Sequence, residues 1–168
     1  MLGFSYDKPA RHMREYLSVL GPLMRGETVA HSGDQYNVNL TLTVPDAGEV
    51  PILVAALGPQ MLKLTGELAD GTITWMTGPR TLEDHIVPSL GGAADAAGKP
   101  SPTVAAGFPI VVTNDVDAAR ETIGNTLAMY GQLPSYRAML DREGIAGPAE
   151  IALAGDENSL RSSLQRLK

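Results

Sequence analysis

Two stretches of the chain run in the same order from an apolar strand through Gly-Pro into a helix, and this repeat constrains the fold most. They are PILVAALGPQMLKLTGELAD and GTITWMTGPRTLEDHIVPSL. Residues 52–56 form an unbroken apolar run, which is typical of a parallel strand buried on both faces. Pro59 and Pro79 stand where a helix would begin, a position that tolerates the missing N–H of proline. The repeat therefore predicts strand-then-helix units, with the second strand over 72–76.

A third unit begins at Val104, where VAAGFPIVVT predicts a strand and Asn114 or Asp115 predicts a helix cap. Pro109 interrupts this strand, and we expect a bulge or a sheet edge there because proline cannot donate to the ladder. Alternating strands and helices indicate an α/β fold with a parallel sheet. Three strands are fewer than a doubly wound sheet of this length supplies and too few to close an eight-stranded barrel. We therefore expect residues 1–168 to form one incomplete domain with open sheet edges.

The first quarter of the chain predicts a helix followed by a hairpin. Residues 9–25 place apolar side chains three and four positions apart, the period of one buried helix face; these side chains are Met13, Tyr16, Leu17, Leu20 and Met24. In VAHSGDQYNV, Ser-Gly-Asp separates two short extended runs, a pattern that favours a hairpin. We interpret residues 27–50 as a hairpin and loop excursion from the α/β framework. Near the other end, Asp156 is expected to cap a last helix.

Composition excludes several classes of function. The formal net charge is −6, and the basic residues are scattered, so we expect no nucleic acid or anionic membrane as a partner. The chain contains no cysteine, which excludes disulfides, thiolate metal sites and a cysteine nucleophile. No stretch approaches the roughly 18 apolar residues of a membrane span, and the first residues lack the pattern of a secretion signal. A cytoplasmic protein is expected.

The loops that lead from strands into helices are the candidate ligand sites, because parallel α/β proteins bind ligands at the carboxyl ends of their strands. In the first loop, residues 56–60, a turn of small residues could bring backbone N–H groups and a helix N-terminus toward an anion such as phosphate. The plainer alternative is that Gly58 only makes the turn and Pro59 only starts the helix. Local pattern by itself favours this alternative, since the segment is neither a Walker nor a GxGxxG motif.

The second loop, Thr77 and Gly78 with Arg80 at its lip, has the same two interpretations, and local pattern again favours a structural one. Trp75 could form the wall of a ring-shaped ligand site, but an aromatic side chain at a strand end more often packs in the core. No metal-ligand spacing and no catalytic-nucleophile motif is apparent. The sequence therefore predicts no metal ligand and leaves the catalytic residues unassigned; its histidines are His12, His31 and His85.

Four segments, taken in order, resemble the luciferase-like monooxygenase superfamily, in particular its deazaflavin-dependent oxidoreductase branch. They are YDKPARHMREYL, LMRGETVAHSGDQYNV, VPILVAALGPQMLKLTGELADGTITWMTGPRTLEDHIVP and LPSYRAMLDREGIAGPAEIALAGDE. The resemblance implies a partial (β/α)8 barrel, with about strands five to seven and their helices present and both ends incomplete. It places strands one to four, with much of the ring pocket and the acid-base residues, before Met1, and strand eight after Lys168. No catalytic residue can therefore be carried over.

The resemblance also implies a cofactor site and so favours ligand binding at the first loop. The family's phosphate loop and the adjoining mouth fall on Ala56, Leu57, Gly58, Pro59, Gln60, Met61, Thr77 and Gly78. The implied cofactor is coenzyme F420, a deazaflavin that exchanges a hydride with a small organic substrate. Two alternatives stay open: an FMN-dependent monooxygenase, and a non-enzymatic α/β binding or interaction domain. The parent enzyme is expected to be a homo-oligomer, and this segment alone is expected to be inactive.

Overall fold

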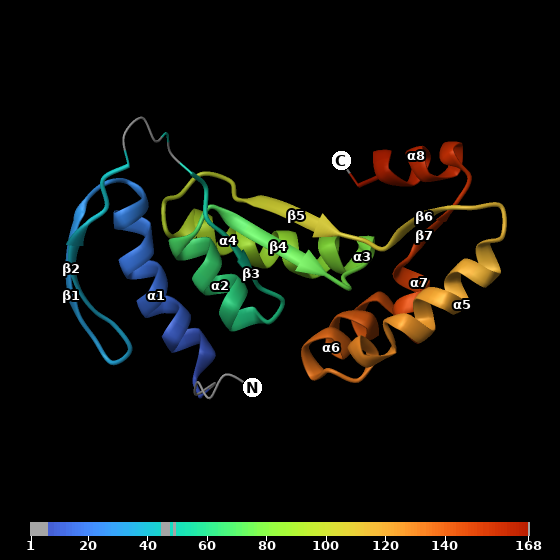
Figure 1. Cartoon of the computed structure of the whole chain (residues 1–168), viewed down its shortest axis with the longest axis horizontal. Helices are drawn as coiled ribbons and strands as arrows, with labels where there is room; N and C mark the ends of the chain where they lie inside the picture. Colours follow the sequence, from blue (N-terminus) through green and yellow to red (C-terminus); the bar gives the residue numbers. More distant parts are fainter. Residues whose placement is uncertain (1–6, 45–47, 49, 168) are drawn as a thin grey trace. The chain divides into compact units, whose positions relative to one another are not determined.

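The structure is a computed structural model that describes residues 7–44, 48 and 50–167. Contacts within the chain divide it into two compact units (Figure 1). Unit 1 comprises Met1–Thr72 and Leu90–Thr103, and unit 2 comprises Ile73–Ser89 and Val104–Lys168. The division passes within strands β4 (Gly71–Trp75) and β5 (Thr103–Gly107). Strands and helices alternate along most of the chain, which confirms the α/β class. The described residues form no closed barrel.

Unit 1 begins with helix α1 (Pro9–Met24), and a two-stranded antiparallel hairpin lies along it (Figure 1). The hairpin consists of β1 (Thr28–Ser32) and β2 (Asn37–Thr41). Its register pairs Thr28 with Thr41 and Ser32 with Asn37. The hairpin predicted within residues 27–50 is therefore present, while residues 45–47 and 49 of that segment lie outside the described residues.

The buried face of α1 differs in part from the predicted stripe. Leu17 is buried, and Met13 packs against the same apolar cluster, as expected. Tyr16, however, is 40% exposed, and Val19 is buried in addition. The ring centroid of Tyr16 lies 5.9 Å from that of Tyr36 in the hairpin turn. Tyr16 thus contacts the hairpin and not the core, an arrangement that helical period alone does not predict.

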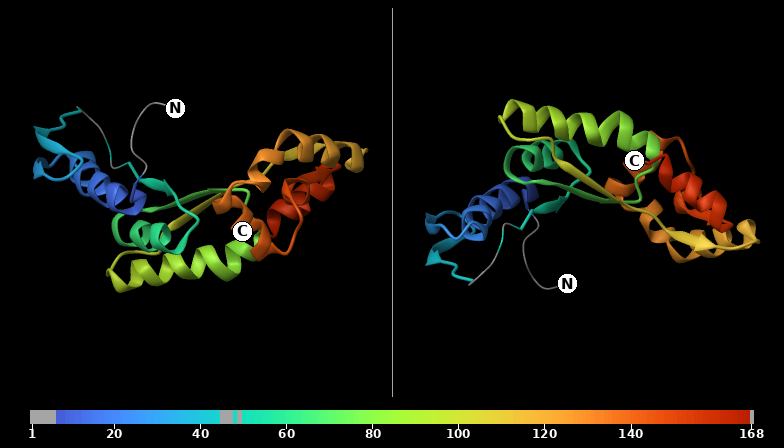
Figure 2. Two further views of the ribbon diagram at one scale, coloured as in Figure 1. Left: turned by 90° about the horizontal axis from the view of Figure 1, so that it is seen from below. Right: turned by 90° about the horizontal axis from the view of Figure 1, so that it is seen from above.

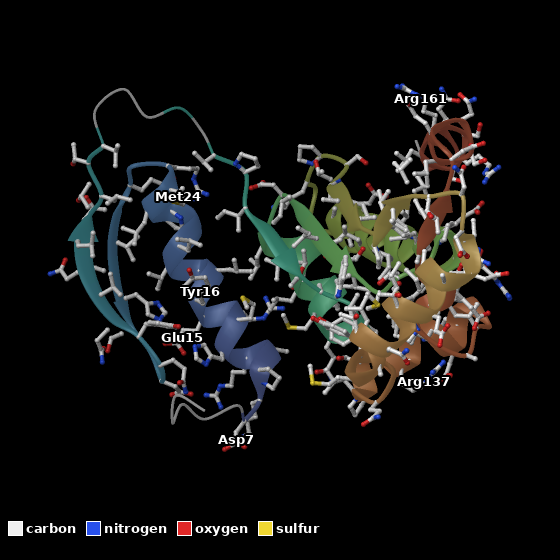
Figure 3. The ribbon with its side chains drawn as sticks, turned by 45° about the vertical axis from the view of Figure 1, so that its right-hand side comes forward. Asp7, Glu15, Tyr16, Met24, Arg137 and Arg161 are labelled. Carbon is white, nitrogen blue, oxygen red and sulfur yellow. The ribbon has the colours of Figure 1, made fainter. Side chains whose placement is uncertain are left out.

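Glu15 fastens the hairpin turn to α1, and Figure 3 shows its side chain directed toward the hairpin. Its Oε1 accepts hydrogen bonds from the backbone N–H groups of Gln35 at 2.9 Å and Tyr36 at 2.8 Å, and lies 3.2 Å from His31 Nε2. Burial acts to raise the pKa of Glu15, but the bonds from Tyr36, Gln35 and His31 together lower this pKa below its ordinary value. A Cβ on Gly33 would lie 2.1 Å from the same oxygen. Glycine at this position therefore leaves room for the carboxylate of Glu15.

Glu15→Gln should reduce the acid sensitivity of unit 1. A carboxylate with a lowered folded-state pKa stabilises the fold above its unfolded pKa, and this stability is lost as the pH falls through the folded pKa. The variant, which has no charge at this position, should lose less stability over that acidic range than the wild type. Thermal unfolding across the range measures the difference. Glu27→Gln, at an exposed glutamate of the same unit, should follow the wild type; an identical pH dependence in Glu15→Gln would contradict the role of Glu15.

The central sheet has the strand order β3-β4-β5, where β3 is Leu53–Ala55. Val54 is buried in the core of unit 1, but Leu53 is 37% exposed and Ala55 is also exposed. The expectation that this strand is buried on both faces is therefore wrong here. The physical reason is that no described segment covers the face that carries Leu53 and Ala55.

One residue joins the starts of all three strands of this sheet. The backbone N–H of Asp70 donates to the carbonyl of Ile52 at 2.9 Å, and the backbone N–H of Ile52 donates to Asp70 Oδ2 at 2.8 Å. The carbonyl of Asp70 accepts a bond from Thr103 N–H at 2.9 Å. Asp70 thus satisfies backbone groups that would otherwise be left unpaired where the strands begin.

Helix α2 (Pro59–Leu68) follows β3 and packs on the core of unit 1. It begins at Pro59, as predicted. Figure 2 shows α2 beside helix α4 (Val87–Ala96). A Cβ on Gly66 of α2 would lie 2.6 Å from the carbonyl oxygen of Leu90 and 2.7 Å from Ala93 Cβ. The close packing of the two helices therefore depends on glycine at this position.

The helix that follows β4 begins at Pro79, also as predicted, but it is not regular. It opens with a single turn, α3 (Pro79–Thr81), and continues as a π-helical turn, η1 (Leu82–Ile86), before α4. Pro88 is the second residue after this turn, and its missing N–H interrupts α-helical hydrogen bonding. Glu83 and Asp84, which the sequence predicts on a solvated face, are both exposed.

The third predicted strand is divided at Pro109. Its first half is β5, and its second half is β6 (Ile110–Val112), which belongs to another sheet. There β6 pairs in parallel with β7 (Leu153–Gly155), with Val111 opposite Ala154. The interruption expected at Pro109 is confirmed, and its consequence is larger than a bulge, because the chain changes its pairing partner at this point.

Helices complete unit 2, and α5 and α8 both contact β7 (Figure 2). The helices between β6 and β7 are α5 (Val116–Thr126), the 3-10 turn η2 (Ala128–Gly131), α6 (Pro134–Glu143) and α7 (Pro148–Ile151), and α8 (Glu157–Gln165) follows β7. The carboxylate of Asp115 accepts a bond from Ala118 N–H at 3.0 Å, and that of Asp156 accepts one from Ser159 N–H at 2.7 Å. Both predicted caps are thus confirmed. The bond from Ser159 also lowers the pKa of Asp156.

Candidate functional site

The first candidate loop joins β3 to α2 within unit 1. Ala56 is buried, and its carbonyl accepts a long hydrogen bond, 3.4 Å, from the hydroxyl of Thr72. Pro59 and Gln60 are exposed. Gly58 has extended backbone angles, φ −81° and ψ 155°, and a Cβ placed on it would meet no atom within 4 Å. Helix α2 therefore begins at an open surface.

The first backbone donors of α2 are available at this surface. The regular bonding of the helix begins with Leu62, whose N–H donates to the carbonyl of Gly58 at 2.9 Å. Gln60 and Met61 precede it, and their N–H groups have no protein acceptor among the residues that the structure describes. The side chain of Met61 packs on the core of unit 1, which holds the helix start in place. Free N–H groups at the positive end of a helix dipole suit an anion such as a phosphate group.

The second candidate loop follows β4 in unit 2, and its two predicted site residues are both buried. The Thr77 hydroxyl donates to the carbonyl of Trp75 at 3.2 Å, so it is used within the protein. Met76 between them is fully buried and has φ 55°, in the left-handed region that non-glycine residues rarely adopt. Backbone strain of this kind is concentrated in functional loops.

Glu143, the last residue of α6, occupies the helix start that follows Gly78. Its Oε1 accepts a bond from Arg80 N–H at 3.2 Å, and its Oε2 accepts bonds from the N–H and the hydroxyl of Thr81, both at 2.7 Å. A Cβ on Gly78 would lie 2.2 Å from Glu143 Cδ. Sequence reasoning missed Glu143, which lies 62 residues from Thr81, and no motif connects the two.

Trp75 packs against its own unit, in line with the structural interpretation. The indole is half-buried, and a Cβ on Gly107 would lie 3.0 Å from its Cε3 atom. Its ring centroid is 6.3 Å from that of Tyr130 in an edge-on contact, and Tyr130 makes a second edge-on contact with Tyr136 at 5.0 Å. The three rings connect β4, η2 and α6 by aromatic packing.

The other residues considered in the sequence have structural contacts. Arg80 is exposed, with its Nε 3.5 Å from Asp84 Oδ2. His12 Nε2 lies 2.8 Å from the hydroxyl of Tyr36, and His85 is 8% exposed within the π-helical turn. In the described parts of the chain, no three potential metal ligands are grouped. None of the helices there combines the length and apolar character that crossing a membrane requires.

A hollow in unit 1 lies away from the candidate loop. It has a volume of about 440 Å³ and is found where β3, β4 and β5 begin, with Met24, Ile52, Asp70 and Lys99 among its lining residues. Lys99 Nζ donates to the carbonyl of Ala69 at the end of α2, so this cation is held by the protein. In α/β barrels this end of the strands serves stability, whereas ligands bind at the carboxyl ends. The first candidate loop lies after the carboxyl end of β3.

Three comparisons relate the chain to known proteins. It is 27% identical over 155 residues to the 5,10-methylenetetrahydromethanopterin reductase of Methanolobus tindarius, covering 92% of this chain and 47% of that protein. It is 32% identical over 157 residues to the F420-dependent glucose-6-phosphate dehydrogenase of Mycolicibacterium gilvum, covering 92% and 45%. The solved coenzyme F420 dependent tetrahydromethanopterin reductase of Methanopyrus kandleri has a similar fold, with a TM-score of 0.74 and 23% identity over 95% of this chain and 54% of that one.

The chain spans about half the length of the curated relatives it matches. The match with the family model described as "Luciferase-like monooxygenase" extends over residues 1–166, which is nearly the whole sequence. The chain therefore belongs to the luciferase-like monooxygenase family, the one that its two Gly-Pro segments resemble.

Proposed function

We propose that the chain is part of a deazaflavin-dependent oxidoreductase and that the start of α2 holds the phosphate of coenzyme F420. The observation that carries this proposal is the open helix start at Gly58, where the N–H groups of Gln60 and Met61 have no acceptor among the described residues. Family membership supports it, and so do relatives and a solved structure whose names specify F420.

In this proposal the residues of the first loop have distinct roles. Gly58 places no charge beside the phosphate, and Gln60 and Met61 donate to it. Pro59 begins the helix at a position where its missing N–H costs no hydrogen bond. Ala56 and Leu57 bring the chain from β3 to this point. Bound there, F420 would supply the hydride carrier that amino-acid side chains lack. Thr77 and Gly78 have less support as ligand contacts. The Thr77 hydroxyl already donates to the carbonyl of Trp75, and the helix start after Gly78 already donates to Glu143.

The remaining features of the parent enzyme are also proposals. We infer a small organic molecule as the substrate, a cytoplasmic location and a homo-oligomeric assembly. We further infer that residues 1–168 belong to one (β/α)8 barrel domain, in which they supply about strands five to seven. The likeness of the fold to a solved F420-dependent enzyme over half of that enzyme supports the barrel assignment.

Parallel titrations with F420 and FMN test the choice of cofactor. The full-length parent protein, which includes residues 1–168, should bind F420 at least about tenfold more tightly than FMN, a difference of about 1.4 kcal/mol. The fluorescence of each cofactor measures its binding. Tight binding of FMN without binding of F420 would replace this proposal with the flavin-dependent monooxygenase alternative, while binding of neither would favour a non-enzymatic α/β domain. The family match and the named relatives favour the enzyme over that domain.

A further inference from the structure

Two helix starts in this chain share the Gly-Pro sequence and a similar glycine backbone but differ in what contacts them. Both have glycine followed by proline, and the backbone at Gly58 (φ −81°, ψ 155°) closely matches that at Gly78 (φ −79°, ψ 169°). The space beside Gly58 is open. At Gly78 the corresponding space is filled by the carboxylate of Glu143, which also accepts the backbone N–H bonds of Arg80 and Thr81.

The position of Glu143 in its own helix indicates that this contact is a built feature. Glu143 is the last residue of α6, where the negative end of the helix dipole disfavours a carboxylate. The same carboxylate lies at the positive end of the next helix start, where the dipole and two N–H groups favour it. The hydroxyl of Thr81 adds a third donor at 2.7 Å. The interaction across the two helices therefore offsets the unfavourable location within α6.

We propose that Glu143 is an internal carboxylate that closes the second helix start to external anions, so that the Gly58 start alone accepts a phosphate. This specificity role rests on the proposed function for the identity of the external anion, although the contacts of Glu143 do not. Because Glu143 is attached to the same chain, its effective concentration at the donors is high, and a free phosphate competes poorly. The carboxylate of Glu143 would also repel the phosphate, because both groups are negatively charged. Glu143 thereby determines which of two similar loops binds the cofactor.

A titration with inorganic phosphate, followed through backbone amide NMR signals, tests this inference. In the wild type, the signals of Gln60 and Met61 should shift, and those of Arg80 and Thr81 should not. In Glu143→Gln and Glu143→Ala, the signals of Arg80 and Thr81 should shift as well, with an apparent affinity at least about tenfold above that of the wild type. Glu121→Gln makes the same change of charge at an exposed position of unit 2 and should behave like the wild type.

The same spectra separate the possible failures. Signals of residues outside the loop report whether a variant is folded, and Glu143→Gln keeps the size of the side chain if the alanine variant does not fold. Equal shifts of Arg80 and Thr81 in the wild type and the variants would overturn the inference, as would folded variants whose two signals stay still. If only the signals of Gln60 and Met61 fail to respond, the phosphate assignment in the proposed function is wrong, while the blocking role of Glu143 stands.

Discussion

Gly58→Asp should weaken the binding of coenzyme F420 by roughly 100-fold and leave the fold intact. The new side chain has room, because a Cβ at this position meets nothing within 4 Å. Aspartate is also a favourable residue at a helix N-cap, where its carboxylate would accept the N–H bonds of Gln60 or Met61. It would thus take the donors proposed for the phosphate and place a like charge beside it. Fluorescence titration with F420 measures the loss, and thermal unfolding checks the fold.

Two further substitutions at Gly58 separate charge from size. Gly58→Ala adds only the Cβ and should bind F420 nearly as well as the wild type. Gly58→Asn has almost the same shape as the aspartate and can also cap the helix, but it has no charge, so its affinity should lie between the two. Wild-type affinity in Gly58→Asp would contradict the phosphate assignment, and a loss as large in Gly58→Ala would show that space and not charge matters there.

Gly66→Ala should lower the free energy of unfolding by about 1–3 kcal/mol, the usual range for overpacking. In an exposed helix the same change would be stabilising, because alanine has the higher helix propensity. At Gly66, however, the new methyl group would lie 2.6 Å from the carbonyl oxygen of Leu90 and 3.0 Å from the backbone nitrogen of Ala94. These are backbone atoms of α4, which cannot move aside as a flexible side chain can. The steric cost therefore exceeds the gain in propensity.

Gly92→Ala is the matched control, since Gly92 lies in α4 and a Cβ there would meet nothing within 4 Å. This variant should be more stable than the wild type by about 0.5–1 kcal/mol. Denaturant unfolding of the three proteins measures both changes. The explanation for Gly66 would fail if the two alanine variants were equally stable.

The features that the sequence predicts correctly are those determined by neighbouring residues. Pro59 and Pro79 begin helices because each needs only its own missing N–H and fixed φ angle. Asp115 and Asp156 cap helices because the donor that each carboxylate accepts lies three residues away. For the same reason the loop around Gly58 could be located from the strand before it and the proline after it.

The features that the sequence does not predict depend on residues far apart in the chain. Glu143 contacts Thr81 across 62 residues, and Glu15 contacts Gln35 across 20. Neither the composition nor the helical and strand periodicity of the sequence predicts these two contacts. The apolar run over residues 52–56 similarly indicates what could be buried, whereas actual burial depends on which segments cover the strand. Leu53 is partly exposed for that reason. Pro109 marks an interruption, but the new pairing of β6 with β7 is a tertiary property.

The bonds of Asp70 also have a consequence for the order in which unit 1 folds. Its contact with Ile52 closes a loop of 18 residues that contains α2, whereas its contact with Thr103 closes a loop nearly twice as long. Chain entropy makes the longer closure less favourable by about half a kcal/mol, a cost that grows only slowly with length. Local contacts also form faster than distant ones. The pairing of β3 with β4 around α2 is therefore expected to precede the addition of β5. Asp70 makes hydrogen bonds in both steps, first with Ile52 and then with Thr103.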